Sequence, residues 1–223
     1  MICVSVAEPT AELCLEVLKG LDFAEVRIDA MHTTIEDMER IFSKPLTLIA
    51  TFMPANTAVM TDRFVDYDTR KKFLMAAIEA GAKYVDIEIQ SDSVYRKELI
   101  EKAKLNDCKV IISFHDFHST PEKENLEEII DLCFNKGADI AKIACKVNSE
   151  RDNLRLLGLL NNDNYQGRTI VIGMGIKGRI TRVAAPLLGS PFTFASLSKG
   201  KETAEGQIEK DMLQKIMRLL KDG

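Results

Sequence analysis

The stretch GAKYVDIEI, residues 81–89, joins a glycine–alanine pair to an apolar run that carries carboxylates at every second position. A second stretch, KGADIAKIA at residues 136–144, repeats the pattern with a lysine inside the apolar run. Glycine commonly ends a helix, so each stretch predicts that a helix stops and a strand begins. The chain therefore alternates helix and strand at these two points.

The same alternation extends along the chain, with helical periodicity between strand-like runs that start mostly about 20 to 30 residues apart. One predicted helix has an apolar face of Leu13, Val17 and Leu18 and ends near Gly20. Eight such units predict a (β/α)₈ TIM barrel, a single compact domain over residues 1–223, and an open doubly wound sheet is the alternative. The predicted strands are 2–6, 23–29, 46–52, 84–89, 109–115, 140–146, 169–175 and 192–197.

Composition argues against several classes of protein. A formal net charge of −4 gives no bulk attraction to nucleic acid or to an anionic membrane. No stretch approaches the roughly 18 apolar residues of a membrane span, and the start of the chain lacks the pattern of a signal peptide. The five scattered cysteines contain no C-x-x-C pair, which favours buried thiols over a disulfide framework or a zinc site. We therefore expect a cytoplasmic protein.

Polar residues fall on one side of several predicted strands. In a barrel, alternate strand residues point inward and the chemistry lies at the carboxyl ends of the strands. Buried charges are costly unless they are paired, so a charged inward set predicts a polar site. The set comprises Ser5, Glu25, Arg27, Asp29, Asp86, Glu88, Ser113, His115 and Lys142.

Lys142 is the residue in this set with the most specific chemistry. Desolvation disfavours the ammonium form, so a lysine in an apolar strand should be a neutral amine that attacks ketones to form a Schiff base. His115 ends another strand and could move protons beside such an adduct. The structural alternative is that Lys142 pairs with a carboxylate such as Glu88, and that His115 is an ordinary core histidine.

Two later segments offer further binding groups. GMGIKGRITRV, residues 173–183, predicts a glycine-rich turn that opens a helix, which could bind phosphate or be a flexible turn. Arg182 within it is placed to clamp a carboxylate, although Arg179 or Lys177 could do so instead. The polar segment 196–212 could fold over the barrel mouth as a lid, with Thr203 and Gln207 as hydrogen-bonding groups, or be a solvated loop.

The succession EVRID, ISFHDF, AKIA, KGRITRV and EGQ resembles the type I 3-dehydroquinate dehydratases. The resemblance runs from Ser5 to Gln207 in the order of the family. It implies a (β/α)₈ barrel, commonly a homodimer, that uses no metal or organic cofactor. The implied reaction is the syn dehydration of 3-dehydroquinate to 3-dehydroshikimate through a lysine Schiff base, a step of aromatic amino-acid biosynthesis.

The resemblance also implies residue roles. Lys142 would condense with the substrate ketone, and His115 would take the proton from the neighbouring carbon and protonate the departing hydroxyl. Glu25 and Arg27 would hold substrate hydroxyls, and Arg182 would bind the substrate carboxylate. The remaining matches to substrate-binding positions are Ser5, Thr203 and Gln207.

The chain departs from the family pattern after the third strand. The family usually reads T-F-R with an acidic residue four positions later, whereas Met53 and Thr57 stand at these two positions. We expect that Arg63, Asp62, Asp66 or Asp68 could substitute for the lost charges. EGQ also replaces the more usual P-G-Q. The alternatives are another Schiff-base barrel lyase or aldolase, and a barrel with weakened catalysis that binds a metabolite.

Overall fold

An α-helix follows every strand in the part of the chain that the structure describes, residues 1–54 and 65–222 of a computed structural model. The strands are β1 (Ile2–Val6), β2 (Phe23–Arg27), β3 (Thr47–Thr51), β4 (Tyr84–Glu88), β5 (Lys109–Asp116), β6 (Ile140–Lys146), β7 (Thr169–Met174) and β8 (Thr193–Ser196). The helices are α1 (Ala11–Leu18), α2 (Ile35–Phe42), α3 (Tyr67–Glu79), α4 (Ser93–Leu105), α5 (Lys123–Asn135), α6 (Glu150–Gly158), α7 (Arg179–Ala184) and α8 (Lys210–Asp222).

The strands belong to one sheet in the order β7-β6-β5-β4-β3-β2-β1-β8. Each predicted strand is confirmed to within two residues at either end. The largest difference lies in the run 23–29, where β2 stops at Arg27 and Ile28–Ala30 form a 3₁₀ turn. The side chain of Arg27 binds that of Asp29 within this turn.

Internal contacts divide the chain into two compact units. The first, here called the N-terminal unit, is Ser5–Ile111, and the second, the C-terminal unit, is Ile112–Gly223 together with Met1–Val4. The single domain over residues 1–223 stays a prediction.

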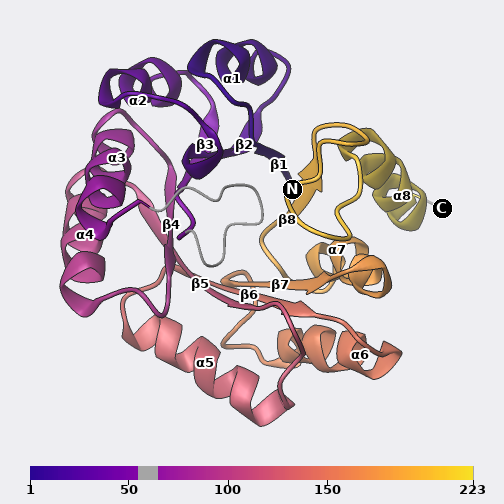
Figure 1. Cartoon of the computed structure of the whole chain (residues 1–223). Coiled ribbons are helices and arrows are strands. Elements are labelled where there is room, and N and C mark those ends of the chain that lie inside the picture. The colour runs from indigo at the N-terminus through magenta and orange to yellow at the C-terminus, as the bar shows by residue number, and fades with distance from the viewer. Residues whose placement is uncertain (55–64, 223) are drawn as a thin grey trace. The chain divides into compact units, whose positions relative to one another are not determined.

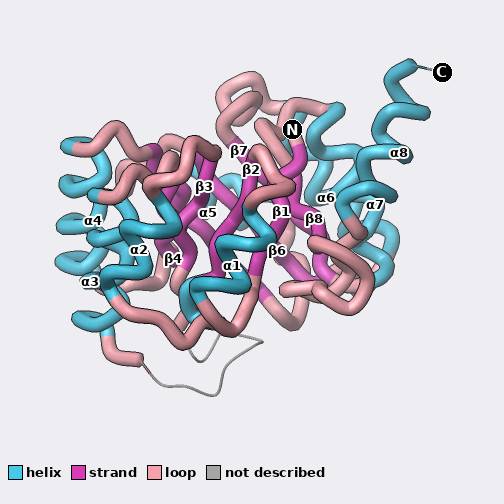
Figure 2. Tube along the Cα trace, turned by 90° about the horizontal axis from the view of Figure 1, so that it is seen from above, coloured by secondary structure: helices cyan, strands magenta, loops and turns pink. Residues whose placement is uncertain are grey.

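In the N-terminal unit, three parallel strands are paired near their carboxyl ends. Arg27 at the end of β2 is paired with Thr51 at the end of β3, and Thr51 is paired with Asp86 on β4. Helices α1 to α4 lie along the outer side of these strands (Figure 1, Figure 2). The register places three polar side chains in a row at one end of the strands.

In the C-terminal unit, β6 and β7 are paired in parallel from Ala141 beside Thr169 to Lys146 beside Met174. Helix α8 packs its apolar residues Leu213 and Met217 against Ala195 of β8. Figure 1 shows α5 to α8 on the outer side of this unit's strands.

The helices begin and end largely as the sequence indicates. Gly81 and Gly137 have φ angles of 111° and 97° after α3 and α5, as expected of glycines that end helices. The predicted face of α1 is wrong in part, since Leu13 is 48% exposed while Ala11, Cys14 and Leu18 are buried. The side chain of Thr10 accepts a hydrogen bond from the N–H of Leu13 and so fixes where the helix starts, and with it the buried face.

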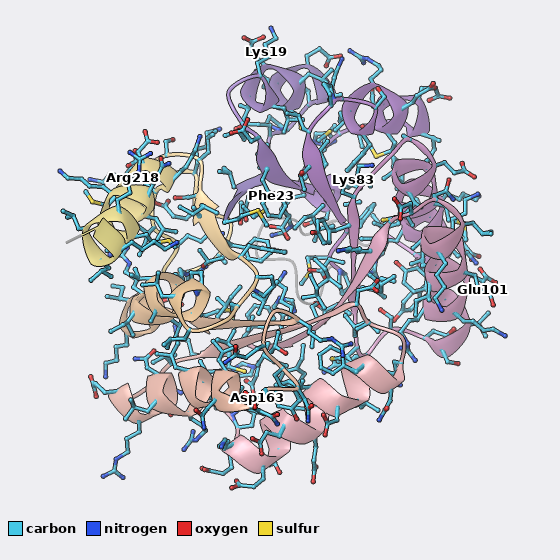
Figure 3. All side chains as sticks on the ribbon, turned by 180° about the vertical axis from the view of Figure 1, so that it is seen from behind. Lys19, Phe23, Lys83, Glu101, Asp163 and Arg218 are labelled. Atoms are coloured by element: carbon cyan, nitrogen blue, oxygen red, sulfur yellow. The ribbon has the colours of Figure 1, made fainter. Side chains whose placement is uncertain are left out.

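Charged side chains cover the outer surface of each unit. Lys19, Glu101, Asp163 and Arg218 extend outward, and Phe23 lies among buried side chains (Figure 3). No helix in the described ranges is both long and apolar enough to cross a membrane. All five cysteines are buried as thiols, and burial raises the pKa of Cys14 and Cys145 to about 12.

Candidate active site

Glu25 is the acceptor at the centre of a buried polar cluster in the N-terminal unit. It is 5% exposed, and its two carboxylate oxygens accept hydrogen bonds from different hydroxyl groups. Ser5 Oγ donates at 2.8 Å and Thr51 Oγ1 donates at 3.0 Å. The predicted residues Ser5 and Glu25 therefore lie together, and the two hydroxyls fix the orientation of the carboxylate.

Arg27 and Asp29 form a buried, two-point ion pair beside Glu25. Nε and Nη2 of Arg27 donate to the two carboxylate oxygens of Asp29 at 3.0 and 2.7 Å. Burial by itself lowers the pKa of Arg27, but the negative charge of Asp29, with smaller contributions from Glu25 and Asp86, raises it above the ordinary value. The guanidinium is therefore a fixed positive charge. We call Ser5, Glu25, Arg27, Asp29 and Thr51 the carboxylate cluster.

The position at which the chain departs from the family pattern contributes to this cluster through its backbone. Met53 is 8% exposed, and its N–H donates to Asp29 Oδ1 at 3.2 Å. Of the residues expected to substitute for the lost charges, Asp66 caps α3 by accepting from the N–H of Thr69. Asp68 pairs with Lys71 at the surface, so neither aspartate is a buried substitute. Thr57, Asp62 and Arg63 lie outside the described residues.

Lys142 lies in the middle of β6 in the C-terminal unit and is 6% exposed. Its Nζ stands 4.7 Å from the centroid of the Phe194 ring. Its sequence neighbours Ala141 and Ile143 are fully buried. The amine is thus held against apolar surface, which is the environment that the sequence predicts for a nucleophilic lysine.

Arg182 and Lys142 both contact Phe194. It is 1% exposed on α7, and Nη1 donates to the carbonyl oxygen of Phe194 at 3.3 Å. Lys177 and Arg179, the alternative carboxylate clamps, are exposed, so Arg182 is the buried cation of the three. We call Lys142, Arg182 and Phe194 the lysine cluster.

His115 is the penultimate residue of β5 and is partly exposed. Its ring stacks on that of Phe117, with 5.9 Å between ring centroids and planes 9° apart. Asp116 fixes the turn that follows by accepting from the N–H groups of His118 and Ser119, each at 2.9 Å. The chain therefore holds the imidazole in a defined plane at a strand end.

The N–H groups of two glycines at the end of β7 and in the turn after it form hydrogen bonds within this segment. The N–H of Gly173 donates to Thr181 Oγ1 at 2.7 Å, and that of Gly178 donates to the carbonyl of Gly175 at 3.1 Å. A Cβ on Gly178 would lie 2.3 Å from the backbone of Gly173. These glycines allow close packing of the turn on itself, and the phosphate interpretation gains no support from them.

The loop after β8, residues 197–209 and here called the β8 loop, closes onto this turn. The N–H of Gly175 and Nη2 of Arg182 donate to the carbonyl oxygen of Glu205 at 3.0 and 3.4 Å. The Glu205 side chain pairs with Lys146 at the end of β6. Glu205 stands where the family usually has proline. The loop is therefore held at this position by an ion pair with Lys146 and not by a rigid proline.

Thr203 and Gln207 of the β8 loop, predicted as hydrogen-bonding groups for substrate, bind one another in the structure. The N–H of Thr203 donates to Gln207 Oε1 at 2.7 Å, and Gln207 Nε2 donates to Thr203 Oγ1 at 3.1 Å. Both residues are at most 4% exposed. The mutual bonds give the loop an internal brace.

Two residues of these clusters were not predicted. Thr51 stands two positions before Met53 within the run that the family reads as T-F-R, so the motif already contained it. Phe194 lies within the last predicted strand, 192–197, and no role was predicted for it. Its apolar ring gave no signal in the sequence, because contact with a lysine depends on the fold.

A cavity of about 480 Å³ in the N-terminal unit lies away from these residues. Thr47 at the start of β3 and Lys83 just before β4 line it, together with the ends of α2 and α3. It contains none of the predicted site residues. Because barrel enzymes place their chemistry at the carboxyl ends of the strands, and this cavity lies at the start of β3 and before β4, the cavity is not a candidate site.

Comparison with known proteins accounts for the shared motifs. The family model described as Type I 3-dehydroquinase matches residues 2–223. The chain belongs to this family. A 3-dehydroquinate dehydratase of Methanocaldococcus jannaschii is 38% identical to this chain over 234 residues. The match covers 99% of this chain and 99% of that relative. A relative of the same name from Methanothermobacter thermautotrophicus is 37% identical over 224 residues, covering 97% of this chain and 95% of its own.

Solved type I 3-dehydroquinase structures share the fold. The enzyme from Clostridium difficile matches with a TM-score of 0.87 at 26% identity, covering 98% of this chain and 91% of that one. The 3-dehydroquinate dehydratase of Aquifex aeolicus matches with a TM-score of 0.82 at 28% identity over 99% of both chains. The predicted (β/α)₈ barrel is thereby confirmed.

Proposed function

We propose that the chain converts 3-dehydroquinate to 3-dehydroshikimate through a Schiff base on Lys142. Membership of the type I 3-dehydroquinase family supports the reaction, as do relatives that are named 3-dehydroquinate dehydratase along nearly their whole length. The observation that carries the mechanism is the buried amine of Lys142, held against the Phe194 ring in the middle of a strand. The Clostridium difficile protein is described with a covalent modified comenic acid, which supports covalent chemistry in that relative.

The proposed steps balance without a cofactor. The Lys142 amine adds to the substrate ketone and water leaves, which forms an iminium. The iminium withdraws electrons from the neighbouring carbon, and His115 takes a proton from that carbon to give an enamine. The enamine expels the hydroxyl group, which His115 protonates, and water then hydrolyses the new imine to release product and amine. The sum is the loss of one water molecule.

The two clusters would then divide the work of binding. In the carboxylate cluster, Glu25 and Arg27 would hold substrate hydroxyls, with Ser5 fixing the orientation of Glu25. In the lysine cluster, Arg182 would bind the substrate carboxylate by charge-assisted hydrogen bonds. Thr203 and Gln207 would exchange their mutual hydrogen bonds for bonds to substrate when it enters.

The broader assignments belong to the same proposal. We propose one catalytic domain over residues 1–223 that acts in the cytoplasm as a homodimer, with no metal or organic cofactor. Neither nucleic acid nor a membrane has a part in the reaction. A phosphate-handling aldolase is less well supported, because the glycines after β7 use their N–H groups within the chain.

Borohydride trapping tests the proposal. The protein is mixed with 3-dehydroquinate, reduced, digested and analysed by mass spectrometry, while the absorbance of 3-dehydroshikimate is followed in a parallel sample. We expect a reduced adduct on Lys142, and a loss of activity of about 10³-fold or more in Lys142→Ala. Lys146→Met is the matched control on the same strand and should keep the adduct.

Each other result has a definite meaning. An adduct without product would favour the metabolite-binding alternative. A variant Lys142→Ala that retained substantial turnover would contradict the Schiff base.

A further inference from the structure

Arg70 is a buried cation that the proposed chemistry does not use. It lies in the first turn of α3 and is 4% exposed. Among the described residues no carboxylate pairs with it, and its contacts are with two rings and one carbonyl. Burying a charge without an opposite charge is costly, so the position calls for a reason.

Helix α3 gives no such reason. The start of a helix carries partial positive charge, so a cation there is unfavourable. The capping role at this end belongs to Asp66, which accepts from the N–H of Thr69 at 2.8 Å. Arg70 therefore does not serve to start the helix.

Two tyrosine rings hold the guanidinium in place. Its central carbon is 5.3 Å from the ring centroid of Tyr67 and 5.5 Å from that of Tyr95. The two rings pack edge to face with centroids 5.2 Å apart. A tyrosine ring is neutral near pH 7 and presents a negative face to a cation above it, and burial raises the pKa of Tyr95 further, to about 12.

Arg70 directs a hydrogen bond at one particular peptide group. Its Nη2 donates to the carbonyl oxygen of Phe52 at 3.1 Å. The N–H on the other side of the same planar peptide belongs to Met53, and it donates to Asp29 Oδ1 at 3.2 Å. One rigid peptide is thus gripped from both sides, by Arg70 at its oxygen and by Asp29 at its hydrogen.

Asp29 connects this peptide to the carboxylate cluster. The same Oδ1 that accepts from Met53 also accepts from Arg27 Nε, and Oδ2 accepts from Arg27 Nη2. The bonds run in one direction, from Arg70 through the peptide to Asp29, which polarises each group along the series. A shift of the peptide would move Asp29, and Arg27 would follow.

We propose that Arg70 is a positioning residue that sets the orientation of Arg27 for substrate through the peptide between Phe52 and Met53. The assignment rests on the proposed function, in which Arg27 holds a substrate hydroxyl. It also gives a role to the altered T-F-M run. The third residue of this run is the uncharged Met53, but Arg70 of α3 brings a positive charge to the backbone of the run.

Arg96 provides a matched control. It occupies the same position, the fourth residue, of α4 that Arg70 occupies in α3. It is 7% exposed, and its Nη1 donates to the carbonyls of Ile89 and Ser91 at 3.2 and 2.8 Å. Arg96→Met thus removes a buried arginine that holds backbone after a strand, without touching the Phe52–Met53 peptide.

The experiment compares Arg70→Met, Arg70→Lys and Arg96→Met with the wild type in two measurements. Steady-state kinetics should show KM raised about fivefold or more in Arg70→Met with a smaller change in kcat, because uniform binding is lost. Amide hydrogen exchange should show the Met53 N–H exchanging about tenfold faster in that variant. Arg70→Lys should recover part of both effects, and Arg96→Met should show neither even if it unfolds at a lower temperature.

Several results would overturn the assignment. Unchanged Met53 exchange in Arg70→Met would show that Arg70 does not hold the peptide, whatever the activity. An equal rise of KM in Arg96→Met would show a general loss of stability. If the wild type itself failed to turn over 3-dehydroquinate, the proposed function would be wrong, and the exchange rates alone would decide whether Arg70 fixes the peptide.

Discussion

The carboxylate cluster and the lysine cluster differ in the groups that their charged side chains contact. In the first, charged and hydroxyl groups bind one another at 2.7 to 3.0 Å, and both oxygens of Glu25 and of Asp29 accept hydrogen bonds. In the second, Lys142 Nζ lies over an aromatic ring, and Arg182 donates to two backbone carbonyls at 3.3 and 3.4 Å. The first is a network of side chains that bind one another, whereas the second places two buried cations beside one aromatic residue of the last strand.

This difference fits two tasks of a covalent enzyme. Groups that recognise hydroxyls do best when their orientation is set before substrate arrives, because ordering them during binding would reduce affinity. A nucleophilic amine must instead change its bonding and charge during the reaction, and burial against apolar surface favours its neutral form. We therefore expect substitutions in the two clusters to affect different steps.

His115→Ala should lower the turnover rate more than the other two changes described below, because it separates proton transfer from formation of the Lys142 adduct. A positioned acid–base group contributes about 10²- to 10⁴-fold to the rate, so kcat should fall by that factor while the Lys142 adduct is still trapped. The measurement is steady-state turnover together with borohydride trapping. His118→Ala, on the exposed turn after the same strand, is the control, and equal rates in the two variants would remove His115 from the mechanism.

Thr51→Val should have an intermediate effect that appears in substrate binding. Valine keeps the shape of threonine and suits a strand, but it removes the hydroxyl that donates to Glu25 at 3.0 Å. The loss of one such bond is worth about 1 kcal/mol, which corresponds to about fivefold in kcat/KM. Thr51→Ser keeps the donor and should stay near the wild type, so a serine variant as weak as the valine variant would contradict the role of the hydroxyl.

Breaking the Lys146–Glu205 ion pair should have the smallest effect. The two side chains are 27% and 61% exposed, and exposed pairs contribute about 0 to 1 kcal/mol. Glu205→Gln should therefore raise KM by no more than about fivefold, and added salt should raise the KM of the wild type toward that of the variant.

A double-mutant cycle with Lys146→Met measures the coupling directly. Full additivity of the two changes would show that the pair does not hold the β8 loop.

The sequence was sufficient for the alternation of elements, because apolar periodicity and glycine-ended helices are local signals. It was also sufficient for Glu25, Arg27, His115, Lys142 and Arg182 as candidates, since charged residues inside apolar runs are conspicuous and the motifs resemble a family. Their roles stay predictions until the experiments above are done.

The parts that failed depend on contacts between distant residues. The face of α1 was misjudged because the Thr10 cap, and not apolar content, sets the helix start. Phe194 was missed because nothing in a phenylalanine indicates a lysine above its ring. Arg70 was missed because its value lies in a hydrogen bond to a backbone carbonyl 18 positions earlier in the chain.

The close approach of Gly206 to Gly175 has a consequence for how this sequence can vary. A Cβ on Gly206 would lie 2.2 Å from the carbonyl oxygen of Gly175, and φ at the two glycines is 82° and 88°. The obstructing atom is backbone, and position 175 already carries the smallest residue. A harmful mutation at codon 206 therefore has no suppressor at codon 175, and revertants selected for growth should restore glycine itself or displace the neighbouring loop.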